Sequence, residues 1–168
     1  MSVPRAAVGL RPAHAADADL LLAWANDPAT RAASFGREPV ARPDHVRWLA
    51  AVLRDRARRL WIAEEAGVPV GQLRVDRLPD GVGVVSIGLA PSARGRGLGH
   101  EVLGLGLAAA AAELGIRRAR AVVMEANAPS RRLFEGAGFA PVAGATVPGR
   151  PAALVLEADL AVIAPDPA

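Results

Sequence analysis

The pattern of apolar and polar residues along the chain predicts a mixture of strands and helices. Apolar runs that alternate with polar residues or contain β-branched residues are typical of strands, and they occur at 7–11, 60–65, 68–75, 84–89, 120–124, 142–147 and 152–160. Apolar residues at helical spacing occur at 17–26, 42–58, 97–114 and 127–136. These runs predict a mixed α/β fold with about seven strands and about four helices.

Turn-forming residues between the runs indicate how the elements connect. Ala66-Gly67 separates two strand patterns and predicts a hairpin, and Pro148-Gly149 predicts a second hairpin near the end of the chain. A strand, a long helix and another strand follow one another over 84–124, which predicts a right-handed crossover. The residues after Ile163 lack any such pattern, and we expect them to be frayed.

Glycine occupies every second position in the turn between the strand at 84–89 and the helix at 97–114. Gly95, Gly97 and Gly99 leave backbone N–H groups uncovered, and the first N–H groups of a helix have no partner within it, so this turn can bind an anion. Arg94 and Arg96 add positive charge. The alternative is a tight turn that uses glycine only for its backbone freedom. Neither a Walker loop nor a dinucleotide fingerprint fits, because the chain has no lysine and the glycine spacing differs.

Length and composition exclude several classes of protein. A chain of 168 residues without a linker-like shift predicts one domain over 1–168. No apolar run approaches the ~20 residues that span a bilayer, and the first residues lack the apolar core of a signal peptide, so we expect a cytoplasmic protein without membrane contact. The absence of cysteine and the scattered positions of the three histidines predict no metal site.

All 20 basic residues are arginine, but acidic residues balance most of them and the formal net charge is +3. A guanidinium grips phosphate well, although biased codon usage explains the same composition. Nucleic-acid binding needs a concentrated basic face interleaved with aromatic residues, and aromatic residues make up only 4% of this chain. We therefore expect no nucleic-acid partner.

Two motifs in the second half of the chain resemble those of one enzyme family. The first, Arg94-Gly95-Arg96-Gly97-Leu98-Gly99, resembles the Q/R-x-x-G-x-G/A signature of the GNAT superfamily of acyl-CoA-dependent N-acetyltransferases. The second, from Asn127 to Phe139, resembles the N-x-x-S/A-x-x-L-Y/F-x-x-x-G-F block of that superfamily and follows at a similar spacing. The resemblance implies a mixed, largely antiparallel, twisted sheet that is splayed between its fourth and fifth strands.

The resemblance also implies acetyl-CoA as the co-substrate, with its arm in the splay and its pyrophosphate on the glycine turn. A backbone N–H near Leu89 is the implied oxyanion donor, turned toward the thioester by a strand bulge that Gly88 would permit. Asn127 is implied to position the acetyl-CoA arm or a water molecule. The implied contacts with acetyl-CoA are Leu89, Arg94, Gly95, Arg96, Gly97, Leu98, Gly99, Asn127, Ser130 and Phe134.

The usual proton-transfer residues of the superfamily are missing. Phe134 stands where many members have the tyrosine that protonates the leaving thiolate, and Val122 stands where the branch that acetylates protein N-termini has a glutamate. A thiol with a pKa of about 8.5 leaves readily as a thiolate, and an amine with a pKa of about 8 is partly neutral near neutral pH. Both losses therefore favour a weakly basic acceptor. Glu125, Ser86 and His45 remain as proton acceptors through water, although each also fits an ordinary structural position.

A narrower resemblance covers the expected acceptor side. The runs 22–35 and 45–48 resemble the W-x-N-D-P-x-x-R-x-x-S and H-x-x-W patterns of GNAT enzymes that acetylate a nucleotide-linked 4-amino-sugar in pseudaminic acid biosynthesis. The run 71–76 is similar to that branch as well. This resemblance implies that Arg31 and His45 contact the acceptor or its diphosphate, while Trp24 and Trp48 wall the pocket. The alternative places both tryptophans in the core, and related ribosomal-protein acetyltransferases share parts of the pattern.

Three hypotheses follow for function. The first is an N-acetyltransferase that acts on a nucleotide-linked amino sugar, and the second is one that acts on a peptide N-terminus or another small amine. The third is an acyl-CoA-binding module without catalysis, because the usual tyrosine and glutamate are absent. The expected partner is a small-molecule amine, and the chain is expected to be a monomer or a homodimer.

Overall fold

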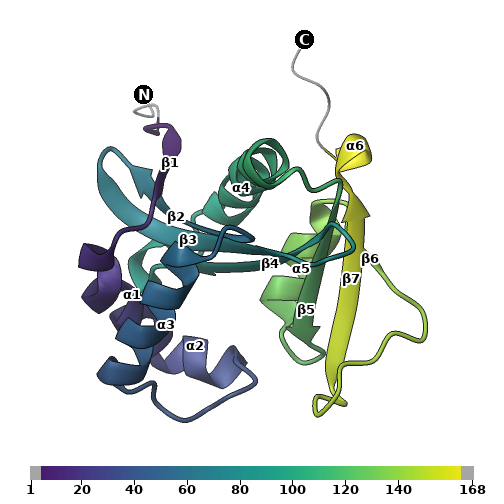
Figure 1. Ribbon diagram of the computed structural model, residues 1–168, viewed down its shortest axis with the longest axis horizontal. Helices are drawn as coiled ribbons and strands as arrows, with labels where there is room; N and C mark the ends of the chain where they lie inside the picture. The colour runs from purple at the N-terminus through teal and green to yellow at the C-terminus, as the bar shows by residue number, and fades with distance from the viewer. Residues whose placement is uncertain (1–4, 164–168) are drawn as a thin grey trace.

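The computed structural model describes residues 5–163 and confirms the predicted mixed α/β fold (Figure 1). The strands are β1 (Val8–Pro12), β2 (Arg58–Glu65), β3 (Val68–Arg77), β4 (Val82–Leu89), β5 (Arg118–Met124), β6 (Ala140–Pro141) and β7 (Ala153–Asp159). The α-helices are α1 (Ala18–Ala25), α2 (Pro28–Ala33), α3 (Arg42–Arg54), α4 (Leu98–Leu114), α5 (Ala128–Gly136) and α6 (Leu160–Ile163). Two short 3-10 helices, η1 (Ala15–Asp17) and η2 (Pro91–Ala93), precede α1 and follow β4.

The strands form one open sheet in the order β1-β2-β3-β4-β5-β7-β6. Neighbouring strands are antiparallel except β4 and β5, which are parallel and are connected through α4. The hairpin predicted at Ala66-Gly67 joins β2 to β3, and both turn residues have positive φ angles. The sheet is therefore mixed and largely antiparallel, as predicted.

β4 and β5 separate soon after they begin. They pair at only three positions, the last being Val84 with Arg120, although β4 continues to Leu89 and β5 to Met124. Figure 1 shows β5 and β7 running steeply down the view, whereas β3 and β4 cross it nearly horizontally. The predicted splay between the fourth and fifth strands is confirmed, and it leaves one edge of β4 unpaired with β5 over its last residues.

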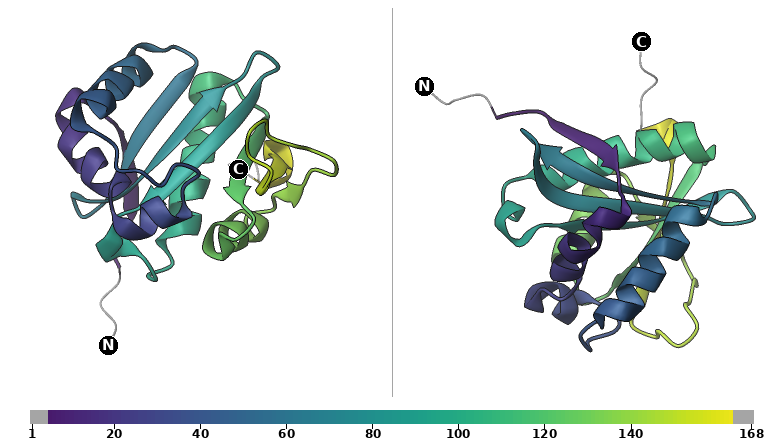
Figure 2. Two further views of the ribbon diagram at one scale, coloured as in Figure 1. Left: turned by 90° about the horizontal axis from the view of Figure 1, so that it is seen from below. Right: turned by 60° about the vertical axis from the view of Figure 1, so that its left-hand side comes forward.

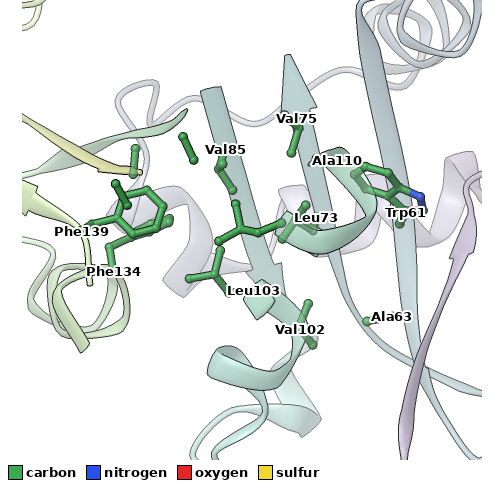
Figure 3. Close-up of a cluster of buried hydrophobic side chains, with 14 of the residues drawn as sticks. Trp61, Ala63, Leu73, Val75, Val85, Val102, Leu103, Ala110, Phe134 and Phe139 are labelled. Atoms are coloured by element: carbon green, nitrogen blue, oxygen red, sulfur yellow. The ribbon is translucent and has the colours of Figure 1, made fainter. Parts of the chain in front are cut away.

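Helices cover both faces of the sheet. α4 packs on one face of β1 to β4, and α1 and α3 lie on the other face (Figure 1, Figure 2). The larger core lies between the sheet, α4 and α5, and it includes Leu73, Leu103 and Phe134 (Figure 3). Gly106 lets α4 approach the sheet closely, because a Cβ there would stand 2.4 Å from a methyl group of Leu73. A smaller core lies between α1, α3 and β2.

The last hairpin differs from its prediction. The predicted strand at 142–147 is a loop apart from one hydrogen bond, from the Val142 N–H to the Val155 carbonyl, and the strand that pairs with β7 on this side is Ala140–Pro141. Pro141 and Pro148 cannot donate ladder hydrogen bonds, and Gly144 has a φ of 71°, which suits a turn. These residues therefore favour a loop over 142–147, although the apolar residues there alternate as in a strand.

Helix boundaries also differ from the prediction. α3 ends at Arg54 rather than near 58, because the Asp55 carboxylate accepts the N–H of Ala57 and turns the chain into β2. Residues 28–33 form α2, and 160–163 form α6, so the structure describes six α-helices where four were predicted. The predicted fraying after Ile163 lies outside the described residues. Among residues 5–163, no helix combines the length and apolar character needed to cross a membrane.

Candidate active site

The glycine-rich turn presents backbone N–H groups at the start of α4. Gly95 and Gly97 have φ angles of 72° and 75°, in the left-handed region that disfavours side chains, and Gly97 is the N-cap of α4. Within residues 5–163, no backbone acceptor faces the N–H groups of Gly95, Arg96 and Gly97, and the Gly97 position supplies no capping side chain. The turn and the first helical N–H groups therefore have the geometry of an anion site.

The two arginines of the turn are held by acidic side chains. Arg94 Nη1 lies 2.9 Å from the Asp27 carboxylate, and Arg94 Nη2 donates to the Thr30 hydroxyl at 3.0 Å. This ion pair, above all, holds the pKa of Asp27 below its ordinary value. Arg96 Nη2 lies 2.5 Å from the Glu65 carboxylate. The anion site is therefore formed mainly by backbone groups, while Arg94 ties the turn to the N-terminus of α2.

The start of α4 lies against the C-terminal half of α5. A Cβ at Gly99 would stand 3.2 Å from Leu133, and a Cβ at Gly136 would stand 2.8 Å from the ring of His100. Leu98 is fully buried in the core. The second motif of the chain thus braces the turn that the first motif forms.

Backbone groups of β4 face the splay. The N–H of Ala90 donates to the carbonyl of Val70 at 2.8 Å, so the even-numbered residues of β4 point their backbone groups toward β3. The N–H groups of Ile87 and Leu89 therefore point the other way, into the gap left by β5. This orientation makes the Leu89 N–H available to a group that enters the splay.

The bulge expected at Gly88 is not present in this pairing. β3 and β4 keep an unbroken register along their shared length, with Gly71 opposite Leu89 at its end. The Leu89 N–H faces the gap through ordinary strand alternation, so no bulge is required for that orientation.

The second motif places its polar residues beside the end of β5. Asn127 is the N-cap of α5, and its Oδ1 accepts the N–H of Ser130 at 3.2 Å. The Glu125 side chain is exposed. Phe134 is only 2% exposed, and its ring meets that of Phe139 edge to face with centroids 5.0 Å apart. The structure therefore places Phe134 within the core below the splay.

A cavity of about 390 Å³ lies beside β3 and β4 on the face covered by α1 and α3. It brings together Arg31, His45 and Trp48 with Ser86 of β4. Ser86 is three positions before Leu89 on the strand that borders the splay. Trp24 is not among the lining residues and instead packs between the two cores. Three of the four residues predicted on the acceptor side therefore share one cavity.

His45 is the most buried polar residue in this cavity. The side chain is 5% exposed, and its Nε2 atom has no hydrogen-bond partner among the described residues. Burial lowers the pKa of His45, opposed by a hydrogen bond to the Ala18 backbone and by the charge of Asp19. The imidazole is therefore neutral near pH 7, and Nε2 can accept a proton or hydrogen bond from a ligand.

Arg31 is held by the chain around it. Its Nε donates to the Ala25 carbonyl at 2.5 Å, and its Nη1 donates to the carbonyls of Gly36 at 2.9 Å and Glu38 at 3.3 Å. Nη2 donates to the Ser34 hydroxyl at 3.3 Å. These bonds use four of the five N–H groups, so Arg31 shapes the cavity wall and retains one donor for a ligand.

Gln72, Arg74 and Asp44 also line the cavity, although none of them was predicted as a site residue. The sequence could have indicated Gln72 and Arg74, because these two polar residues lie on one face of β3, opposite the face on which Leu73 is buried. The Arg74 guanidinium stacks 5.5 Å above the Trp48 ring. Within residues 5–163, no cluster of three His, Asp or Glu side chains has the arrangement of a metal site.

Several known protein structures have a similar overall fold. A domain from Methanocaldococcus jannaschii is 24% identical, with 92% of this chain and 99% of that chain covered and a TM-score of 0.77. Spermidine N-acetyltransferase from Vibrio cholerae in complex with CoA and spermine is 17% identical, with coverages of 90% and 95% and a TM-score of 0.78. Aminoglycoside acetyltransferase AAC(6')-Ib in complex with coenzyme A is 21% identical, with coverages of 91% and 95% and a TM-score of 0.79. These proteins share the fold of this chain.

A family model described as an acetyltransferase (GNAT) domain matches residues 7–140. The matched range contains the glycine-rich turn, the splayed strands and the motif that begins at Asn127. The chain therefore belongs to the GNAT family of acetyltransferases and is an acyl-CoA-dependent N-acetyltransferase.

Proposed function

We propose that the protein transfers an acetyl group from acetyl-CoA to the primary amine of a small acceptor, and that the acceptor is a nucleotide-linked amino sugar. The observation that carries this proposal is the cavity of Arg31, His45 and Trp48, which reaches β4 at Ser86 beside the unpaired edge of that strand. An amine held there lies next to the gap in which a thioester has access to the Leu89 N–H.

The residues of the turn and the strand edge fit acetyl-CoA. Backbone N–H groups of Gly95 to Gly97 and the start of α4 suit a pyrophosphate, and the splay suits an extended arm. Acetyl-CoA supplies the thioester whose acetyl group is transferred. The Leu89 N–H stabilises negative charge that develops on the carbonyl oxygen during attack by the amine. Asn127 and Ser130 flank the other side of the splay at the start of α5.

Proton transfer in this proposal uses few protein groups. The amine must be neutral to attack, and an amine with a pKa of about 8 is partly neutral near neutral pH without a base. The new bond between nitrogen and the acetyl carbon forms as the carbon–sulfur bond breaks. The nitrogen then loses a proton, for which the unpartnered Nε2 of His45 is the buried acceptor in the cavity. The thiolate leaves without a tyrosine, since the chain contains none.

The charges in the cavity support an acceptor that carries an anionic group beside its amine. Arg31 and Arg74 line the cavity, with Arg74 paired to Asp76 of the same strand at 3.2 Å, and its one acidic lining residue among those described, Asp44, is paired with Arg47. Spermidine and aminoglycosides, which the named solved relatives act on, carry several positive charges. A site for such polycations is expected to present several unpaired carboxylates. A nucleotide-linked amino sugar has one amine and a negatively charged diphosphate, so it suits this cavity better.

Thiol release from acetyl-CoA with an amine panel tests the proposal. The panel contains a nucleotide-linked 4-amino-hexose, spermidine, an aminoglycoside and a peptide with a free N-terminus. We expect the highest kcat/KM with the amino sugar. His45→Ala should lower this kcat/KM by about tenfold or more. His14→Ala is the matched control and should stay near wild type, because His14 is exposed and outside the cavity. Better turnover on the peptide or spermidine would overturn the acceptor assignment, and no release with any amine would favour a binding module.

A further inference from the structure

A second cavity, of about 450 Å³, lies beside the last residue of β5, one of the two strands that border the splay. Its walls come from the loop after α2, the end of β5 and the loop before β7, and they include Phe35, Met124 and Arg150. Figure 1 shows the chain after α2 running toward the lower ends of β5 and β7. The glycine-rich turn contributes nothing to this lining, so the cavity is separate from the expected pyrophosphate site.

Phe35 and Arg150 form a flat, positively charged wall in the second cavity. The guanidinium carbon of Arg150 lies 4.3 Å from the centroid of the Phe35 ring, which is a stacking distance. The other lining residues that the structure describes are Met124, glycine, proline and alanine, without an acidic side chain. Glu125, which follows Met124, is exposed outside the lining. Such a wall suits a planar ring with negative charge close by.

Arg31 joins the two cavities. It lines the first cavity, and its Nη1 donates to the carbonyl of Gly36, which lines the second. At about 390 Å³ the first cavity is at the small end of the range for ligand pockets, which is roughly 300 to 1,000 Å³. It can hold a sugar ring, but a nucleotide attached to that sugar must extend beyond it. The second cavity is the one whose wall Arg31 contacts through Gly36.

We propose that the second cavity is a subsite for the nucleoside diphosphate part of the acceptor, with the base stacked on the Phe35–Arg150 wall. This inference rests on the proposed amino-sugar function and adds binding determinants outside the amine cavity. A guanidinium can stack through its face while its edge donates to a phosphate. Arg150 therefore contacts both the base and the diphosphate, and Arg31 offers its remaining donor on the path between the cavities.

Calorimetry on the full chain saturated with CoA tests this subsite, because bound CoA keeps the probe out of the cofactor site. The probes are uridine diphosphate and guanosine diphosphate, with pyrophosphate and uridine for comparison. We expect a nucleoside diphosphate to bind at least about tenfold more tightly than either fragment. Phe35→Ala and Arg150→Ala should each weaken its binding by about tenfold, and Phe35→Tyr should retain it.

Arg37→Ala is the matched control, since it removes an exposed charge from the same loop without altering either lining. Its nucleotide affinity should stay within about twofold of wild type, and CoA affinity should be unchanged in every variant. Absence of nucleoside diphosphate binding, or equal affinity in wild type, Phe35→Ala and Arg150→Ala, would overturn the subsite.

Acetylation kinetics separate this inference from the proposed function. If a nucleoside diphosphate binds as expected but the nucleotide-linked amino sugar is not acetylated, the proposed function fails and the subsite stands. If the sugar is acetylated and its KM is unchanged in Phe35→Ala and Arg150→Ala, the subsite fails and the proposed function stands.

Discussion

Arg94 and Asp27 form an ion pair that joins the glycine-rich turn to the N-terminus of α2, the helix that carries Arg31 of the proposed acceptor cavity. The Nη1 to Oδ2 distance is 2.9 Å, and the same carboxylate caps α2 by accepting the N–H of Thr30 at 3.1 Å. α2 in turn carries Arg31, which lines the cavity. One guanidinium therefore connects the turn proposed to bind acetyl-CoA to the cavity proposed to bind the acceptor.

Arg94→Ala should raise the KM for the acceptor by about three- to tenfold and change the KM for acetyl-CoA by no more than about twofold. The reason is that Arg94 contacts Asp27 and Thr30, whereas backbone N–H groups form the anion site. Arg96→Ala is the matched control, because Arg96 pairs with Glu65 on the other side of the turn. Steady-state kinetics with each substrate varied in turn measure both constants. A rise confined to the KM for acetyl-CoA would instead show that Arg94 binds the cofactor directly.

Gly97→Val should abolish acetyl-CoA binding. Gly97 has a φ of 75°, which a β-branched residue strongly disfavours, and the N–H groups around it would be covered or turned away. Gly104→Ala is the control within α4, because nothing stands within 4 Å of a Cβ there and its φ is not positive. That change should preserve acetyl-CoA affinity and stabilise the helix by roughly 0.5–1 kcal/mol. Calorimetry and thermal unfolding measure the two effects, and unchanged affinity in Gly97→Val would remove the turn from the cofactor site.

Local patterns and long-range contacts differ in how far the sequence could predict them. The glycine turn, the crossover and the cap at Asn127 were predictable, because each depends on residues that are close in sequence. The Arg94–Asp27 pair was not, since neither residue type nor spacing indicates which arginine meets which carboxylate across the fold. The helix predicted over 17–26 ends at Ala25, close to its predicted end, yet the role of Asp27 as the partner of Arg94 depends on tertiary packing. The strand at 142–147 failed because proline and glycine outweighed apolar alternation.

Phe134→Tyr should leave turnover within about tenfold of wild type. A thiol with a pKa of about 8.5 leaves as a thiolate at little cost, so a new acid adds little. Phe134 is 2% exposed against Phe139, so the added hydroxyl must find a partner or destabilise the fold by about 1–3 kcal/mol. Single-turnover kinetics and denaturant unfolding measure the two effects. A gain of about a hundredfold in turnover would mean that the wild-type enzyme is limited by the missing acid.

His45 should affect stability and activity in different pH ranges. Burial lowers its folded-state pKa, so the unfolded chain binds a proton below about pH 6.5 under conditions in which the folded chain does not. Stability should therefore fall as pH drops below about 6.5, and His45→Gln should reduce this dependence when melting temperature is measured from about pH 5 to about pH 8. The rise of kcat/KM at higher pH should instead follow the acceptor amine, because His45 is already neutral there. The pH at which kcat/KM rises should therefore be higher for an acceptor whose amine pKa is about 9 than for one whose amine pKa is about 7.5. A rise that stays at one pH for both acceptors, and moves only in His45→Gln, would assign the titration to the histidine.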